Sequence, residues 1–288
     1  MNTDIRIDWH AGMEITPQTF IDMENDLGEH RMILRKILAT QVFGVVPQSK
    51  FVLNYDLSNK DIQIREIECT LMLPSGQVVI AQSEEDLSVP IPDRKDDILY
   101  LTVSIGDKTR SYDRGGIPHI AYEYVFDCRT LDEIHDAIPL LKLKNANGRA
   151  VDEDFILPVV SARSSLILME KVDQIKQQIQ KILEHESFQK LEDKLLVRLI
   201  AGQLLDFRAD DSPRMLASRC SKLATVLSYP VFERSADLPE YNLLDIEPFL
   251  RRFIGFIGET LTAMDDLKPK PAEVPEPEPV EEVFCPTI

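Results

Sequence analysis

Hydrophobic and polar residues alternate over much of residues 50–127, which is the period-two pattern of β-strands. The alternating apolar positions form three runs: Ile67, Cys69, Leu71 and Leu73; Leu99, Leu101, Val103 and Ile105; and Ile120, Tyr122, Tyr124 and Phe126. The sequence Pro74-Ser75-Gly76 follows the first run and favours a turn into Val78-Val79-Ile80, hence a hairpin. Because no helical pattern alternates with these runs, they predict an antiparallel β-sandwich.

A helical pattern precedes the strands. Thr16 and Pro17 suit an N-cap and a first helical residue, because a threonine hydroxyl can accept a backbone N–H and proline lacks one. Apolar residues then recur at helical spacing: Phe20, Met23, Leu27, Leu34 and Leu38. The pattern predicts a helix to about Thr40 that packs one face against the rest of the protein.

Helical spacing returns after the loop-forming sequence Asn145-Ala146-Asn147-Gly148 and continues to Leu267. The first helix of this part carries an apolar seam with spacings of four and three residues: Leu168, Val172, Ile175, Ile179 and Ile182. Such a seam is typical of helices that pack along their length. It is interpreted as the core of an intramolecular bundle or, alternatively, as a contact shared between subunits.

Three more helices are predicted after this one. The first has a broad apolar face that suits a bundle interior: Leu191, Leu195, Leu196, Leu199, Ile200 and Leu204. The second begins at Ser212-Pro213, buries Leu216, Leu223 and Leu227 and ends at Pro230, and Asp245 is a candidate cap for the third. Four helices joined by short loops predict a four-helix bundle.

These patterns predict an α+β protein of several parts. Residues 1–150 hold the N-terminal helix and the β-sandwich, residues 151–267 the helical bundle, and residues 268–288 an acidic, proline-rich tail. The tail cannot bury enough apolar surface to order itself. It nevertheless contains Val283, Phe284 and Ile288, which we call the tail hook.

Composition excludes several functional classes. The 288 residues include 49 acidic and 32 basic side chains, and the formal net charge of −17 disfavours nucleic acid and anionic lipid as partners. No stretch reaches the roughly 18 uncharged apolar residues of a membrane-spanning helix, and the first ten residues do not predict a secretory signal. Four widely spaced cysteines are typical of reduced thiols. We therefore expect a cytoplasmic protein without membrane insertion.

Motifs for catalysis and metal binding are missing from the sequence. The five histidines are scattered, and none forms a His-Glu-x-x-His group. Asp113-Arg114-Gly115-Gly116 lacks the spacing of a phosphate-binding loop, and no Gly-x-Ser-x-Gly elbow occurs. The sequence thus predicts no catalytic, cofactor-binding or metal-ligating residues and a non-enzymatic structural role. The alternative is a hydrolase whose site is assembled from distant residues.

Two segments resemble a known family. The sequence from Trp9 to Phe20 resembles Trp-x-x-Gly-Met-x-Leu-x-Pro-Gln-x-Phe, the opening of TssK proteins of the type VI secretion baseplate. The segments Ile138–Leu143 and Val151–Pro158 are similar to the family's link between its β-rich and helical parts. With the strands and helices between and after them, the resemblance covers about residues 5–265.

This resemblance implies a non-enzymatic homotrimer without cofactors. The family's β-sandwich shell, which is like that of phage receptor-binding proteins, binds the TssF–TssG wedge, and a helical middle part follows. No counterpart of the family's C-terminal head is expected after the helices, as in short forms of Bacteroidota-type systems. The implied role is a trimeric adaptor that links the wedge to membrane-side components at the inner face of the inner membrane. A phage-tail-like receptor-binding or adaptor protein outside secretion is the alternative.

The same resemblance suggests two contact regions. Trp9, Met13, Ile15 and Phe20 are expected to bind the wedge, because exposed apolar side chains before a capped helix can anchor a partner. The alternative is that they cover the sandwich core. The tail hook is expected to bind a membrane-complex component after ordering, and the alternative is an inert end.

Overall fold

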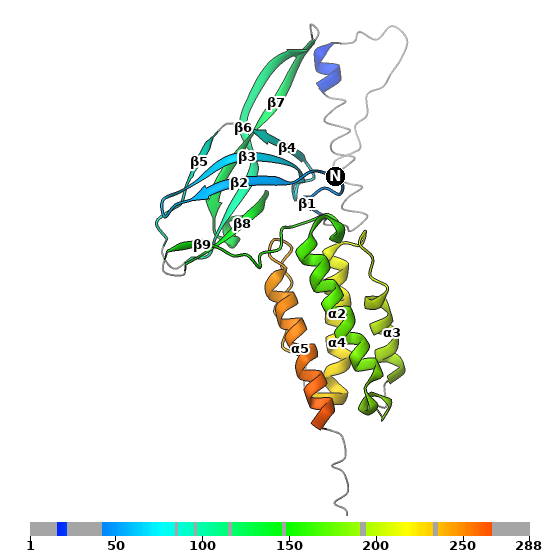
Figure 1. The fold of residues 1–288 in the computed structure, drawn as a ribbon. Coiled ribbons are helices and arrows are strands. Elements are labelled where there is room, and N and C mark those ends of the chain that lie inside the picture. Colours follow the sequence, from blue (N-terminus) through cyan, green and yellow to red (C-terminus); the bar gives the residue numbers. More distant parts are fainter. Residues whose placement is uncertain are drawn as a thin grey trace, which may run out of the picture.

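The computed structural model describes residues 16–21, 42–83, 86–94, 97–114, 117–145, 148–190, 194–232 and 236–266. Two antiparallel β-sheets come first along the chain, and a group of long helices follows (Figure 1). The helices lie side by side below the sheets in this view. The arrangement confirms the predicted α+β class, with a β-rich first part and a helical second part.

The first sheet is built around one long strand, β3 (Asp61–Met72). Its antiparallel partners are β1 (Gly44–Val45), β2 (Val52–Leu57), β4 (Val78–Ser83) and β5 (Leu87–Pro90). Alternate side chains of the predicted run from Ile67 to Leu73 are at most 2% exposed. Gly76, with a φ of 97°, lies in the turn between β3 and β4, which confirms the predicted hairpin.

The second sheet has the order β7–β6–β8–β9. Its strands are β6 (Leu99–Arg114), β7 (Ile117–Arg129), β8 (Ala137–Asn145) and β9 (Arg149–Val151). Leu99, Leu101 and Val103 are fully buried, as their alternation predicts. Tyr124 and Phe126 of β7 pack against the same core, with their rings edge to face at a centroid distance of 5.6 Å.

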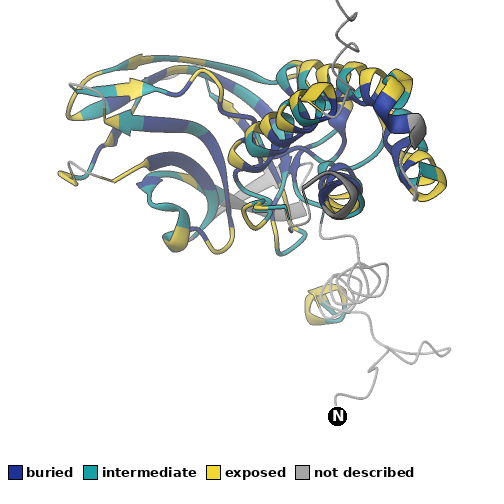
Figure 2. Ribbon diagram, turned by 90° about the horizontal axis from the view of Figure 1, so that it is seen from below, coloured by how far each residue is buried: buried dark blue, intermediate teal, exposed yellow. Residues whose placement is uncertain are grey.

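Buried faces of both sheets and of the helices join in one hydrophobic cluster. Ile64 and Leu71 contribute from the first sheet, Leu101 and Ile138 from the second, and Leu168 from the first long helix. Figure 2 shows buried positions running along the middle of the strands and onto the helices. Each such side chain contributes about 1.5–3 kcal/mol when removed from water, so the sheets and helices stabilise one another.

The helices are α2 (Leu166–Glu184), α3 (Lys194–Leu205), α4 (Pro213–Phe232) and α5 (Glu247–Asp266). Ser165 caps α2, since its hydroxyl accepts a hydrogen bond from the Leu168 amide at 3.2 Å. A short 3₁₀ segment, η3 (Glu186–Lys190), follows α2. Both α2 and α4 contact α3 and α5, so each helix has two helical neighbours.

The α3 prediction is partly wrong. Leu195, Leu196 and Leu199 are 76%, 48% and 65% exposed, and the side chains that face inward are those of Val197, Ala201 and Leu204. A helix with leucine on nearly every side has no unique apolar face, so its contacts with α2 and α4 decide which stripe is buried. Leu191 lies outside the described residues.

Two predicted helix boundaries are also wrong. Helix α4 begins after Ser212 as predicted and buries Leu216, Leu223 and Leu227, but it continues past Pro230 to Phe232. Pro230 removes the N–H of one helical hydrogen bond, and because only two residues of the helix follow it, the turn that it disturbs is the last one. Asp245 does not cap α5, which begins at Glu247; its carboxylate binds side chains of the second sheet instead.

The N-terminal helix is confirmed only over its first turn. Residues 17–21 are helical, and the Thr19 amide donates to the Thr16 hydroxyl at 3.3 Å, as expected for a threonine cap. The remainder of the prediction, residues 22–40, lies outside the described part of the chain.

At Gly44, strand β1 approaches the segment before α2 so closely that a side chain has no room. The Val45 amide donates to the Pro158 carbonyl at 2.9 Å, and the Val160 amide donates back to the Val45 carbonyl at 3.0 Å. Gly44 has a φ of 111°, and an added Cβ would lie 2.1 Å from the Pro158 oxygen. Backbone and carbonyl must both move to accept a side chain there.

We predict that Gly44→Ala lowers the free energy of unfolding by more than about 2 kcal/mol. The matched control is Gly202→Ala in α3, where a Cβ meets nothing within 4 Å and the helix gains up to about 1 kcal/mol. Urea unfolding of both variants measures the effects. Equal changes in the two variants would contradict the close approach at Gly44.

Candidate functional site

Charged side chains are buried where the second sheet meets the helices. Lys142 of β8 is 4% exposed, and its Nζ lies 2.5 Å from Asp245 Oδ2 and 3.7 Å from Asp152 Oδ2. The Tyr100 hydroxyl of β6 donates to the same Asp245 oxygen at 2.8 Å. Lys144 Nζ lies 2.6 Å from the other oxygen of Asp152. We call this group, together with Glu247 and Arg251, the junction cluster.

The junction cluster is balanced in charge. Glu247 at the start of α5 is buried, and the Arg251 guanidinium lies 2.5 Å from its carboxylate. Three buried carboxylates therefore face three cations, the buried Lys142 and the partly exposed Lys144 and Arg251, which offsets much of the cost of taking the buried charges out of water. Burial, together with the nearby Asp245 carboxylate, raises the pKa of the Tyr100 phenol well above its usual value, so the hydroxyl remains a donor at neutral pH.

Backbone and aromatic contacts surround these ion pairs. The Asp152 amide donates to the Lys142 carbonyl at 2.8 Å, which fixes the link after β9 against β8. The rings of Tyr100 and Phe155 meet edge to face at a centroid distance of 5.9 Å. Lys142 and Asp152 thus belong to the two halves of the linking motif recognised in the sequence.

Sequence reasoning missed the ion pairs themselves. Lys142 and Asp245 are 103 residues apart, and no pattern in the chain connects them. The available signal was a lysine inside an apolar strand, Ile138–Leu143, since a charged residue there needs a partner. The local pattern predicts Asp245 as a helix cap, because it precedes an amphipathic run. Its pairing with the buried Lys142 overrides this local preference.

The ion pairs of the junction cluster hold the second sheet and the start of α5 in a fixed relative position. Asp152 and Asp245 are each less than 6% exposed and are held by lysines. Among the described residues, no three His, Cys, Asp or Glu side chains are grouped in a way that could hold a metal ion. His185 lies away from the cluster, near the end of α5, with its Nε2 3.1 Å from Asp265.

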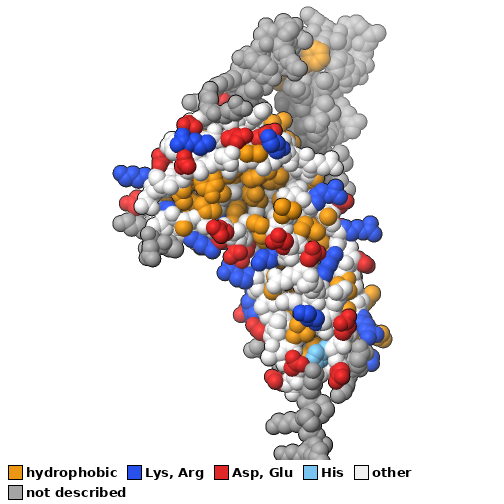
Figure 3. Space-filling model, in the orientation of Figure 1, with side chains coloured by type: hydrophobic (Ala, Val, Ile, Leu, Met, Phe, Trp, Pro, Cys, Tyr) orange, Lys and Arg blue, Asp and Glu red, His pale blue; other side chains and the backbone are white. Residues whose placement is uncertain are grey.

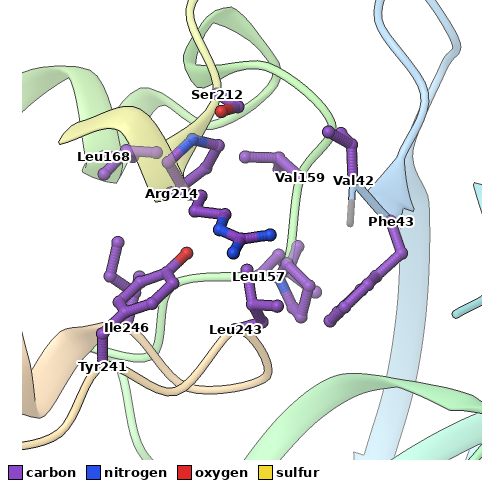
Figure 4. A pocket seen from close by; sticks show the side chains of 12 residues that line it. Val42, Phe43, Leu157, Val159, Leu168, Ser212, Arg214, Tyr241, Leu243 and Ile246 are labelled. Carbon is purple, nitrogen blue, oxygen red and sulfur yellow. The ribbon is translucent and has the colours of Figure 1, made fainter. Parts of the chain in front are cut away.

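A small cavity lies beside the junction, between β1, the segment before α2 and the loop before α5 (Figure 4). Its volume is about 20 Å³, enough for about one water molecule. The Arg214 side chain reaches into it among Leu157, Tyr241 and Leu243. A wider, open hollow of about 670 Å³ shares Phe43, Arg214 and Tyr241 with it and is also lined by His135 and Glu240.

The structure places the predicted contact residues as follows. Phe20 is 53% exposed, whereas Trp9, Met13 and Ile15 lie outside the described residues, as does the tail hook. The helical seam of α2 is at most 2% exposed within the single chain: Leu168, Val172, Ile175, Ile179 and Ile182. The seam therefore has partners inside the chain.

Exposed apolar side chains occur at places that the sequence did not indicate. They include Val78 and Ile80 on β4, at 52% and 69% exposed, Leu166 at the start of α2, at 82%, and the three leucines of α3. In the view of Figure 3, hydrophobic side chains also gather over the sheets, whereas the helices show more scattered charges. None of the described helices is both long and apolar enough to cross a membrane.

We predict that Lys142→Met lowers the free energy of unfolding by about 3–5 kcal/mol, because it leaves Asp245 and Asp152 buried with less compensating charge. Lys50→Met is the matched control, since Lys50 pairs with Glu68 at the surface, where solvent screens the pair, and its loss should leave the free energy of unfolding nearly unchanged. Urea unfolding compares the two. Similar small losses would show that the buried pairs do not hold the junction.

Comparisons place this architecture among known proteins. No family model matches the sequence, and no curated protein matches it significantly. A crystal structure of TssK superposes with a TM-score of 0.61 at 13% identity, over 90% of this chain and 70% of that chain. A chain of the TssK-TssF-TssG baseplate subcomplex of the type VI secretion system gives 0.60 at 14% identity, over 91% and 100%.

A third structure, TssK from T6SS EAEC in complex with nanobody nb18, gives a TM-score of 0.55 at 15% identity, over 84% of this chain and 68% of that chain. At such identities the likeness is evidence for the fold. It extends through both sheets and the helices that follow them. The chain therefore has the fold of TssK, a baseplate protein of the type VI secretion system.

Proposed function

We propose that this protein is a structural baseplate component of a type VI secretion system and acts as a TssK-like adaptor. The observation that carries the proposal is the match of 91% of this chain to a whole chain of the TssK-TssF-TssG subcomplex. That subcomplex supports TssF and TssG as the partners here. The likeness is to structural baseplate proteins and not to an enzyme family, which favours a role without catalysis.

On this proposal the two parts of the chain have separate tasks. Residues 1–150 form a sandwich-like shell that binds the wedge, and residues 151–267 form a four-helix bundle. The junction cluster supports this division, because its ion pairs couple strands β6 and β8 to the start of α5. An adaptor must hold its two ends in a fixed relation, and buried charges tolerate little displacement.

The shell is proposed to bind the wedge through Trp9, Met13, Ile15 and Phe20. The exposure of Phe20 supports this, since a large apolar side chain that is more than half accessible can anchor a partner. A homotrimer would present three such surfaces and raise the effective concentration of weak contacts. Because the α2 seam is buried within one chain, trimer contacts would have to use other surfaces.

The remaining parts of the proposal concern the membrane side. We place the assembled protein in the cytoplasm at the inner face of the inner membrane, with the tail hook of residues 283–288 as its contact to a membrane-complex component. A phage-tail-like adaptor outside secretion would share the fold, and its partners would differ.

Co-expression tests the proposal directly. The protein should co-purify with TssF and TssG from the same system, and light scattering should give the mass of a trimer. A monomer that binds neither protein would contradict the adaptor role. A trimer that binds neither TssF nor TssG would favour the phage-tail-like alternative.

We further predict that Phe20→Asp lowers the recovery of TssF and TssG about tenfold or more, as expected for an interface anchor. Ile80→Asp on β4 is the matched control, because Ile80 is also a large apolar side chain, 69% exposed, but belongs to a different element. Both variants should unfold at the wild-type urea concentration. An equal loss in the two variants would show that Phe20 has no special part in binding.

A further inference from the structure

Helix α3 presents an apolar surface that nothing in the described chain covers. Leu195 and Leu199 are 76% and 65% exposed, Leu196 is 48% exposed, and Gly202 continues their stripe with open space around it. Figure 3 shows hydrophobic side chains projecting at the outer side of the helices where α3 lies. Three exposed leucines within two helical turns form a compact patch, which is typical of a contact surface. We call it the α3 face.

The α3 face begins at the same end of the helices at which α5 ends (Figure 1). Helix α5 ends at Asp266, and its last turn binds the region between α2 and α3. The Ser187 hydroxyl donates to the Met264 carbonyl at 2.9 Å, and His185 Nε2 lies 3.1 Å from Asp265 Oδ1. The segment η3 in turn contacts α3, where the Arg198 guanidinium lies 5.6 Å from the centre of the Phe188 ring.

The segment between the end of α5 and the tail hook is long enough to reach the α3 face. Sixteen residues separate Asp266 from Val283, and at roughly 3.1–3.6 Å per residue they span up to about 50–60 Å when extended. The whole of α3, with 12 residues, is about 18 Å long. A tether of this length keeps the tail hook at a roughly millimolar effective concentration near the α3 face, where a weak apolar contact suffices.

Charge favours the same pairing. Residues 268–288 contain five glutamates and two lysines, and Glu281 and Glu282 immediately precede the hook. The charged residues of α3 are Lys194 and Arg198, both basic, and they alternate with the exposed leucines along the helix. The two cations of α3 thus lie beside the exposed leucines and can attract an acidic segment that ends in apolar residues, while Glu192 and Asp193 directly before the helix offset them at its start.

We infer that the tail hook, Val283, Phe284 and Ile288, docks intramolecularly on the α3 face formed by Leu195, Leu196 and Leu199. The docked hook covers these leucines in the free protein. A partner of the tail must then displace the hook from α3 before it can bind, and its apparent affinity falls by the fraction of hook that is docked. This self-contact does not depend on the identity of the protein's other partners.

Cysteine cross-linking in the full chain tests the contact, since the hook sequence contains Cys285. Cys69, Cys128 and Cys220 are buried, and burial raises the pKa of each thiol, so they react slowly at neutral pH. A cysteine introduced by Gly202→Cys sits on the stripe with free space around its Cβ. Under mild oxidation it should form an intramolecular disulfide with Cys285, identified by peptide mass spectrometry.

The matched control is Gln180→Cys, at an exposed position of α2. The residue that follows α2, His185, contacts the last turn of α5, so this cysteine is also within reach of the tail. If the hook docks on α3, the Gly202→Cys disulfide forms at least about tenfold faster than the Gln180→Cys disulfide, as a local concentration effect. Adding Leu199→Glu to Gly202→Cys should remove this preference, and because Leu199 is at the surface the fold should be unaffected.

Three results would overturn the inference. Equal rates for the two single cysteines would mean that the tail samples both helices without docking. A preference that persists with Leu199→Glu would exclude the leucines as its cause. Dimers on a non-reducing gel, with Cys285 of one copy joined to the new cysteine of another, would assign the α3 face to a second copy of the chain.

Discussion

The structure depends most on the buried pairing of Lys142 with Asp245, supported by Asp152 and Tyr100. These residues come from two strands, the link after β9 and the entry to α5, so one ionic group joins elements that lie far apart in the chain. A buried ion pair often adds little net stability compared with apolar packing. Its effect here is directional, because the charges are compensated only when the sheet and α5 keep their observed relation.

Two other contacts act at the same junction. β1 binds the segment 158–160 through its backbone, and Gly44 permits the close approach. The hydrophobic cluster continues from the sheets into the helices without a break. Together they explain how a β-rich part and a helical part, each with its own apolar pattern, behave as one body, which is the property that an adaptor between two assemblies requires.

Apolar surface is left exposed in places that the proposed adaptor role requires for contacts with partners. Phe20, the outer side of β4 and the α3 face are exposed, whereas the α2 seam is fully consumed within the chain. The exposed fraction of each side chain therefore distinguishes the apolar residues that stabilise the fold from those that remain available for contacts with partners. The sequence could not make this distinction for α3, because leucines on all sides of a helix give the same local pattern whether they face a neighbour or water.

The sequence by itself determined the strands, the hairpin at Pro74–Gly76, the helix starts at Thr16 and Ser212, and the apolar seam of α2, since these follow from backbone preference and the period of apolar residues. Tertiary structure alone decided that Asp245 neutralises Lys142, that α4 passes Pro230 and that α3 turns three leucines outward. Those outcomes depend on contacts between residues far apart in the chain, whose free energies exceed the local preferences that a sequence pattern reports.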